Sequence, residues 1–289
     1  MWFLLALSSA ILAGVRRTGE KQLLHQINQF TLGWIIQLLS LPVILASLLV
    51  TGQLLNPLHL GLSFWIPIMI GMILFYPLNT FFLGRAIKHG ELSKVLPIQS
   101  FGPILTIVFG LLFLHQVPSK FALLAIGFVS AGLYVLNIQR RSLHNPLRPF
   151  MEDRASLYMF LSTVLVAAIV PIDTIAINAS TPATYAVVST ASAAIILYLT
   201  AKIAHRATLS PAKHWRSLSI LGTMQGAAYI TVVIALTLGP AAYISAVKSS
   251  GILIGAITGL IVLKERLTMQ KGISFGLIGI GLAILALAK

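Results

Sequence analysis

The stretch that decides the fold is residues 86–133, AIKHGELSKVLPIQSFGPILTIVFGLLFLHQVPSKFALLAIGFVSAGL, which recurs as residues 235–282, ALTLGPAAYISAVKSSGILIGAITGLIVLKERLTMQKGISFGLIGIGL. The two copies align at a shift of 149 residues without a gap. Five glycines then fall on five glycines: Gly90 on Gly239, Gly102 on Gly251, Gly110 on Gly259, Gly127 on Gly276 and Gly132 on Gly281. An internal repeat fixes architecture, and in hydrophobic sequence it predicts paired halves related across a bilayer.

The composition is that of a membrane protein. Hydrophobic residues make up 57% of the chain, charged residues only 9%, and the mean hydropathy is +0.94. This leaves too little polar surface to cover a water-soluble globule of 289 residues. The absence of cysteine excludes a disulfide framework, a thiolate metal site and a cysteine nucleophile. We expect no cofactor and no bound metal.

Apolar stretches long enough to span a bilayer occur ten times, since a spanning helix needs about 20 such residues. They are residues 2–19, 28–50, 62–84, 92–114, 119–138, 156–177, 182–203, 217–238, 241–263 and 270–288. The first is the weakest, because its apolar run ends at Arg16 and Arg17. If it spans fully, Arg16, Arg17 and Glu20 must reach the interface or face a wet cavity.

Basic residues alternate between the two sides of these ten stretches. Of the 20 Lys and Arg residues, 17 fall in the loops after the first, third, fifth, seventh and ninth stretch. Cytoplasmic loops retain positive charge, so this pattern predicts that those five loops are cytoplasmic and both termini lie on the far side. It also accounts for the net charge of +14 without nucleic acid as a partner. The lipid bilayer is the expected partner, and the cell (inner) membrane the expected location.

Five spans are an odd number, so equivalent loops of the two copies must face opposite sides. The predicted fold class is therefore an all-α integral membrane protein with ten transmembrane helices in two inverted five-helix repeats. The first repeat is residues 1–138 and the second is residues 156–289. Residues 139–155, rich in Arg, Asn and Pro, are the connecting loop.

Residues 86–133 and 235–282 resemble the last three helices of the EamA repeat in the drug/metabolite transporter superfamily. The typical pattern has an Ala-rich helix end, a proline in the fourth helix, Leu-Gly-Glu, and a Gly-rich fifth helix. The second copy has Leu263-Lys264-Glu265 and the first Leu114-His115-Gln116, so the acidic position survives only as Glu265. The resemblance implies a transporter with cytoplasmic termini, whereas the charge pattern, to which we give more weight, predicts the reverse orientation.

Lys248 is the first candidate for a substrate-binding residue, because an ionisable group inside a span is functional by default. It lies about seven residues inside the ninth stretch, and its repeat equivalent is Gln99. Two polar groups facing each other across a pseudo-two-fold axis would sit where inverted-repeat transporters hold substrate. The alternative is that Lys248 reaches the membrane surface or bonds helix-end carbonyls.

Further polar and aromatic residues share helix faces at a spacing of three or four residues. They are Tyr76, Asn79, Gln225, Tyr229, Trp34 and Gln37. Aromatic walls with a few amides suit a small organic solute. Interhelical hydrogen bonds and aromatic belts at the interface explain the same pattern equally well.

Asp173 and Glu265 are the two candidates for coupling transport to protons. Asp173 is the only acidic residue well inside a span, two residues after Pro171. It could carry a proton, pair with Lys248 or Arg17, or sit near the outer interface. Glu265 lies at the end of the ninth stretch, where fixing that helix is the simpler role.

The inventory of side chains excludes an enzyme inside the membrane. All seven histidines fall in loops or at helix ends, and one buried acid cannot form an aspartyl pair. We therefore expect a secondary transporter of the EamA type, monomeric or homodimeric. It would export a small organic metabolite, for example an amino acid or another carboxylate-bearing solute, by alternating access. The alternative is a channel or a non-catalytic structural membrane subunit.

Overall fold

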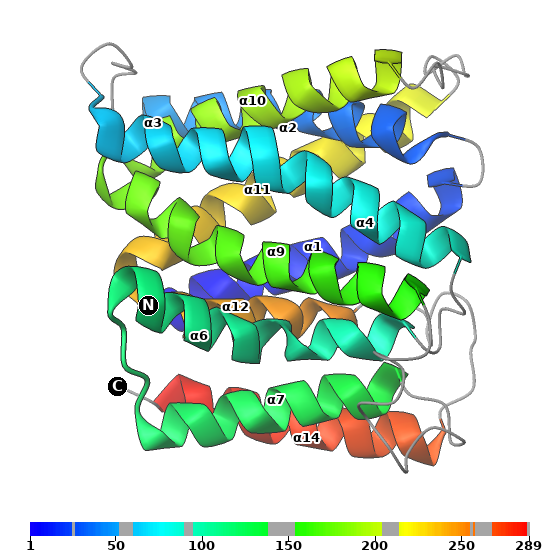
Figure 1. Ribbon diagram of the computed structural model, residues 1–289, viewed down its shortest axis with the longest axis vertical. Helices are drawn as coiled ribbons and strands as arrows, with labels where there is room; N and C mark the ends of the chain where they lie inside the picture. The colour runs from blue at the N-terminus through cyan, green and yellow to red at the C-terminus, as the bar shows by residue number, and fades with distance from the viewer. Residues whose placement is uncertain are drawn as a thin grey trace.

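The computed structural model describes residues 1–24, 27–51, 60–89, 95–137, 154–203, 214–254, 257 and 268–287, and within these ranges all regular structure is helical (Figure 1). The first part of the chain forms α1 (Trp2–Leu24), α2 (Gln29–Thr51), α3 (Leu62–Ile68), the π-helix η2 (Met69–Phe75), α4 (Tyr76–His89), the 3-10 helix η3 (Leu96–Phe101), α6 (Gly102–Leu114) and α7 (Lys120–Asn137). The second part forms α9 (Arg154–Asn178), α10 (Pro182–Ile203), α11 (Trp215–Leu238), α12 (Ala241–Ser249) and α14 (Met269–Leu287).

Seven helical segments of the described chain are long and apolar enough to cross a membrane. Three shorter apolar helices accompany them, at Trp2–Arg16, Lys120–Leu136 and Ala241–Ile254. Helical residues thus lie in every one of the ten predicted stretches, and the prediction of an all-α membrane fold is confirmed. Of the predicted connecting loop, residues 139–153 lie outside the described ranges.

The outer surface of the bundle is apolar. Large side chains such as Leu49, Leu62 and Phe121 are 86%, 75% and 70% exposed. The interior is instead rich in small residues, as on α10, which buries alanine, serine and threonine along its length. Small residues allow helices to approach closely in lipid, whose chains are as apolar as leucine itself. This distribution fits a protein whose solvent is a bilayer.

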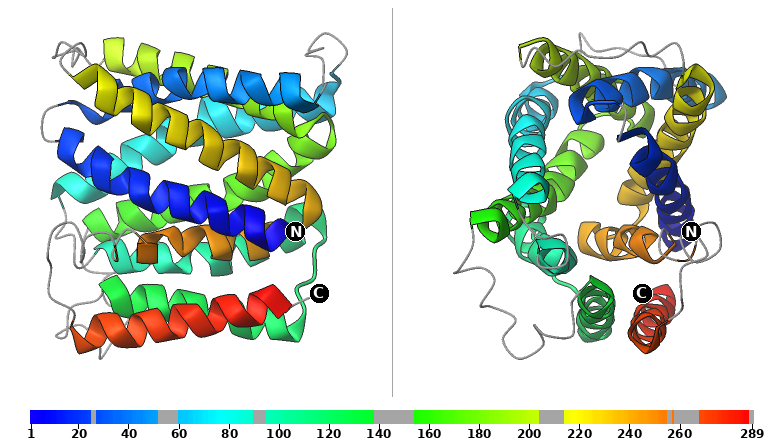
Figure 2. Two further views of the ribbon diagram at one scale, coloured as in Figure 1. Left: turned by 180° about the vertical axis from the view of Figure 1, so that it is seen from behind. Right: turned by 90° about the vertical axis from the view of Figure 1, so that its right-hand side faces the viewer.

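The two copies of the repeat pack directly against one another. α7 packs on α14 and α2 on α10, and the members of each of these two pairs occupy positions related by the 149-residue shift; α6 packs on α12. Figure 2 shows α7 and α14 together at one end of the bundle, and both chain termini lie on the same side in Figure 1. α1 packs on α11 and α9 on α4, and each of these two contacts is the equivalent of the other under the same shift. Contacts that are equal under exchange of the two copies are what a two-fold axis produces.

The contacts between α7 and α14 show that the pair is antiparallel and symmetric. A Cβ placed on Gly132 would meet Ile278 and Ser274, and one placed on Gly281 would meet Val129 and Ala125. The second pair is the first pair shifted by 149 residues, so each glycine contacts the equivalents of the residues that the other contacts. Gly132 and Gly281, two of the glycines that mark the repeat, are therefore points of close approach between its copies.

Two local features of the helices were not predicted. Helix α3 passes through the π-helix η2 before α4 begins, and Pro77 follows directly. Proline has no N–H to donate to the carbonyl four residues earlier, and π-helical turns often occur at functional sites. In the first repeat, α6 is preceded by η3, which contains Pro97, whereas the equivalent residues 245–249 of the second repeat lie in the α-helix α12.

Candidate functional site

A narrow cavity lies inside the second half of the chain, between α9, α10, α11 and α12. Its lining residues are Val170, Asp173, Tyr185, Tyr229, Val232, Val233, Leu236, Ile244, Ser245 and Lys248. The cavity volume is about 30 Å³, which is room for about two water molecules. The cavity is therefore closed around its polar groups, and helices must separate to admit an organic solute.

Asp173 and Lys248 bring opposite charges to this cavity. Asp173 lies on α9, where a Cβ placed on Gly71 of the π-helix η2 would come within 3.6 Å of its Oδ1 atom. Lys248 lies in the last turn of α12 and acts electrostatically on the Asp173 carboxylate. The helix is interrupted at Ser250, directly after that turn. Lys248, one of the partners predicted for Asp173, shares its cavity.

Tyr185, near the start of α10, is a site residue that the sequence analysis missed. Its side chain is only 1% exposed and lines the cavity. The hydroxyl has the Asp173 carboxylate and the Tyr229 hydroxyl as hydrogen-bonding neighbours, although neither contact has the geometry of a full hydrogen bond. A buried hydroxyl whose hydrogen bonds are incomplete is costly, so this donor can turn to a ligand that enters the cavity. The repeat contained the signal, because the equivalent of Tyr185 is the apolar Ile36.

Tyr229 on α11 completes the polar wall of the cavity. Its hydroxyl shares a hydrogen bond with Ser189 Oγ of α10 at 2.8 Å. Ser245 lies on the opposite side, where its Oγ is 3.2 Å from Thr106 Oγ1 of the first half. The cavity thus offers a cation, a carboxylate, two phenol hydroxyls and an aliphatic hydroxyl.

A second polar group of residues lies on α1, α2 and α4. The Gln37 amide donates to Tyr76 Oη at 3.2 Å, and the charges of Arg16 and Glu20 act on that same hydroxyl. Arg16 and Glu20 form an ion pair one turn apart, and their side chains are 18% and 20% exposed. The ion pair with Glu20 compensates the charge of Arg16, which is largely buried in the bundle.

The other residues that were singled out from the sequence and that the structure describes do not line the Asp173 cavity. Asn79 accepts a hydrogen bond from Ser162 Oγ at 2.6 Å, Gln99 donates to Met159 Sδ at 3.4 Å, and Trp34 packs edge-to-face on Tyr198 at 5.5 Å between ring centroids. Gln225 is half-buried on α11. Glu265 falls outside the described residues.

Metal binding finds no support in the described part of the chain. No group of three or more His, Cys, Asp or Glu side chains there could hold a metal ion. The cavity instead has one residue of each charge and several hydroxyls on apolar walls. That donor set suits an organic molecule with a charged group.

Comparisons with known proteins point to one family. A sequence profile described as the EamA-like transporter family matches residues 1–138 and 153–287. A Sinorhizobium sp. protein named "Uncharacterized transporter in cobO 3'region" is 28% identical over 138 residues, which span 47% of this chain and 96% of that protein. The relative is therefore about the length of one of the two matched segments.

A protein of known crystal structure has the same fold, with a TM-score of 0.81 over 99% of this chain and 96% of its own, at 15% sequence identity. The family match extends through both copies of the repeat and nearly the whole sequence. The matched residues include seven helical segments that are long and apolar enough to cross a membrane. This multi-pass membrane protein belongs to the EamA-like transporter family.

Proposed function

We propose that the protein is a secondary transporter which exports a small organic solute bearing a carboxylate, by alternating access to the cavity between Asp173 and Lys248. The observation that carries the proposal is the cavity itself, in which a lysine, an aspartate and a buried tyrosine hydroxyl meet inside a membrane protein. Polar groups at membrane depth are costly, and they mark substrate and ion pathways.

The proposed architecture is ten transmembrane helices in two inverted five-helix halves, residues 1–138 and 156–289, joined by residues 139–155. The two family matches support this division. The antiparallel, symmetric contacts of α7 and α14 support an inverted relation between the halves. Rocking of one half against the other would open the cavity to either side of the membrane in turn.

In this proposal Lys248 binds the solute carboxylate and Tyr185 donates a hydrogen bond to it. Asp173 neutralises Lys248 in the empty state and takes up a proton when the solute displaces it. Proton entry at Asp173 in exchange for solute exit would drive export. The hydrogen bond between Ser189 and Tyr229 orients the aromatic wall beside this pair.

The test uses the purified protein in liposomes and a screen of amino acids, sugars, phosphorylated metabolites and cationic drugs by thermal shift. The best ligand is then followed in a countertransport assay, in which unlabelled solute inside the vesicle accelerates uptake of labelled solute. Acceleration requires a site exposed alternately to the two sides, so a channel or a structural subunit would show none.

Replacing Lys248 with Ala should abolish uptake of an anionic solute. Lys120→Ala is the matched control, because Lys120 lies at the start of α7 and lines neither of the described cavities. Unchanged uptake by the Lys248 variant, or a best ligand that carries only positive charge, would refute the assignment of Lys248.

A further inference from the structure

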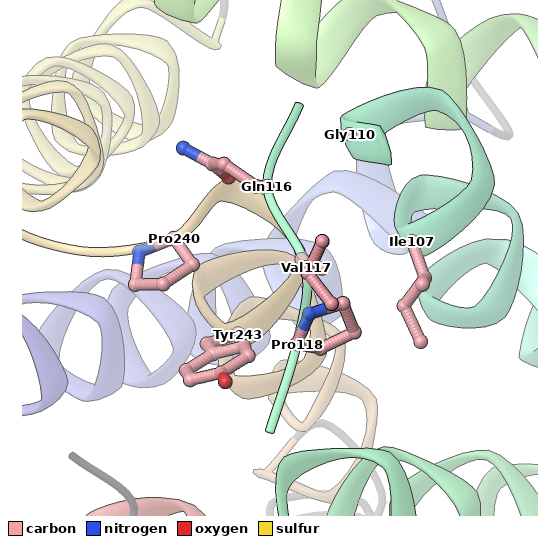
Figure 3. A pocket seen from close by; sticks show the side chains of 8 residues that line it. Ile107, Gly110, Gln116, Val117, Pro118, Pro240 and Tyr243 are labelled. Carbon is pink, nitrogen blue, oxygen red and sulfur yellow. The ribbon is translucent and has the colours of Figure 1, made fainter. Parts of the chain in front are cut away.

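A second cavity separates the two halves at the end of the bundle where both termini lie. Its volume is about 150 Å³, and its walls include Ile107, Gln116, Pro118, Pro240 and Tyr243. Figure 3 shows Gln116 and Tyr243 on its rim, the first on the segment between α6 and α7, the second on α12. Gln116 stands where the EamA pattern has glutamate, and the Asp173 cavity gives it no role.

The Gln116 side chain accepts a hydrogen bond from a backbone N–H group at the start of a helix in the other half. Helix α12 begins after Pro240, which provides no side-chain cap. The first N–H groups of a helix have no partner within it, and an uncapped start is destabilising. Here Gln116 Oε1 accepts the hydrogen bond from Ala241 N at 3.0 Å. The backbone of His115, with φ 52°, ends α6 in the left-handed conformation one residue earlier.

Tyr243 provides the reciprocal contact. Ser119 precedes α7 and caps it, since its Oγ accepts from Ala122 N at 3.3 Å. The Ser119 N–H in turn donates to Tyr243 Oη of α12 at 2.9 Å. Each half therefore satisfies a backbone N–H group at a helix start in the other half, through the side chains of Gln116 and Tyr243.

Helix α12 connects these contacts to the Asp173 cavity. Tyr243 lies beside Ile244 and Ser245, which line that cavity together with Lys248 one turn further on. A displacement of the start of α12 must therefore move three of the cavity's lining residues. Contacts between halves at a closed end have to break when the halves rock.

We propose that Gln116 and Tyr243 form a latch that closes the Asp173 cavity toward the side of the membrane on which the termini lie. This inference rests on the proposed function. The latch consists of neutral hydrogen bonds, each weak enough to break during transport and sufficient together to favour the closed state. Loss of either bond should shift the population toward the state open on that side.

The experiment exploits the absence of cysteine from the natural chain. Ser245→Cys places one thiol in the Asp173 cavity, and its reaction rate with a membrane-impermeant thiol reagent is measured from each side of the membrane. Leu287→Cys, at the end of α14 beside the C-terminus, identifies the side on which the termini lie. Labelling is measured without transport. The latch proposal can therefore be refuted while the transporter assignment stands, and the transporter assignment can be refuted while the latch proposal stands.

Gln116→Met and Tyr243→Phe, each added to Ser245→Cys, should speed labelling from the termini side about fivefold, the effect of one neutral hydrogen bond. Gln116→Glu keeps an acceptor for the helix start and should label no faster than the parent. Gln270→Met is the matched control, because Gln270 Nε2 donates to Val135 O of the other half at 2.6 Å, away from both cavities. Unchanged rates in both latch variants, or an equal rise in the Gln270 variant, would overturn the proposal.

Discussion

The symmetric contacts of α7 and α14 predict that four glycine-to-alanine substitutions fall into two matched pairs. A Cβ on Gly132 would lie 2.6 Å from Ile278 Cγ1 and 3.0 Å from both Ile278 N and Ser274 O. A Cβ on Gly281 would lie 2.7 Å from Ala125 O and 3.0 Å from Val129 N. Backbone atoms cannot swing aside as a side chain can, so the two helices must move apart.

The cost follows from the size of the overlap. Carbon contacts are most favourable at about 3.5–4.0 Å, so the helices would separate by roughly 0.5–1 Å. Overpacking of this kind costs about 1–3 kcal/mol, and contacts to backbone place it in the upper half of that range. Alanine returns about 1 kcal/mol through its higher helix propensity. The expected net loss is about 1–2 kcal/mol for Gly132→Ala and the same for Gly281→Ala.

Gly127 and Gly276 provide the control, because they are also equivalent in the repeat but face open space. Gly127→Ala and Gly276→Ala should therefore be neutral or slightly stabilising. Thermal unfolding in detergent measures the difference, with an expected fall of a few degrees in Tm for the first pair. Equal Tm values for all four variants, or a loss at only one of Gly132 and Gly281, would refute the two-fold relation between the helices.

Three further predictions concern charged and polar groups inside the bundle. Asp173→Asn should leave solute exchange intact but abolish its response to a pH gradient, measured in liposomes; transport still driven by the gradient would contradict proton coupling at Asp173. Tyr185→Phe should weaken solute binding about fivefold in a titration, as expected for one lost hydrogen bond, whereas Tyr198→Phe, outside the cavity, should not; equal effects would remove Tyr185 from the site. Glu20→Gln leaves the Arg16 charge without its partner and should lower Tm, and the double variant with Arg16→Gln should recover part of the loss; additive losses would show that the pair does not interact.

The prediction from sequence was most complete where the signal is local or periodic. The apolar lengths of the spans follow from the thickness of a bilayer, and helical residues lie in all ten stretches. The family was identified from residues 86–133 and 235–282 and is confirmed by the match to both halves. Lys248, Asp173 and Tyr229, three of the predicted site residues, line one cavity.

The sequence could not decide how the helices rotate and which side chains meet. Gln99 and Lys248 are equivalent positions of the repeat and were expected to face each other. In the structure Gln99 donates a hydrogen bond to Met159, whereas Lys248 lines the Asp173 cavity. The two positions differ because the 3-10 turn around Pro97 has no counterpart in α12. Tyr185 was missed because an isolated tyrosine in an apolar helix has no local mark of function.

By itself the sequence determined that this chain lies in a membrane and is built from two copies of one repeat. Those properties depend on composition and spacing, which can be read along the chain. Only the tertiary structure decided that one carboxylate, one lysine and a buried hydroxyl face the same space, and that each half caps a helix of the other. Such meetings depend on the packing of helices distant in sequence, for which no spacing rule exists.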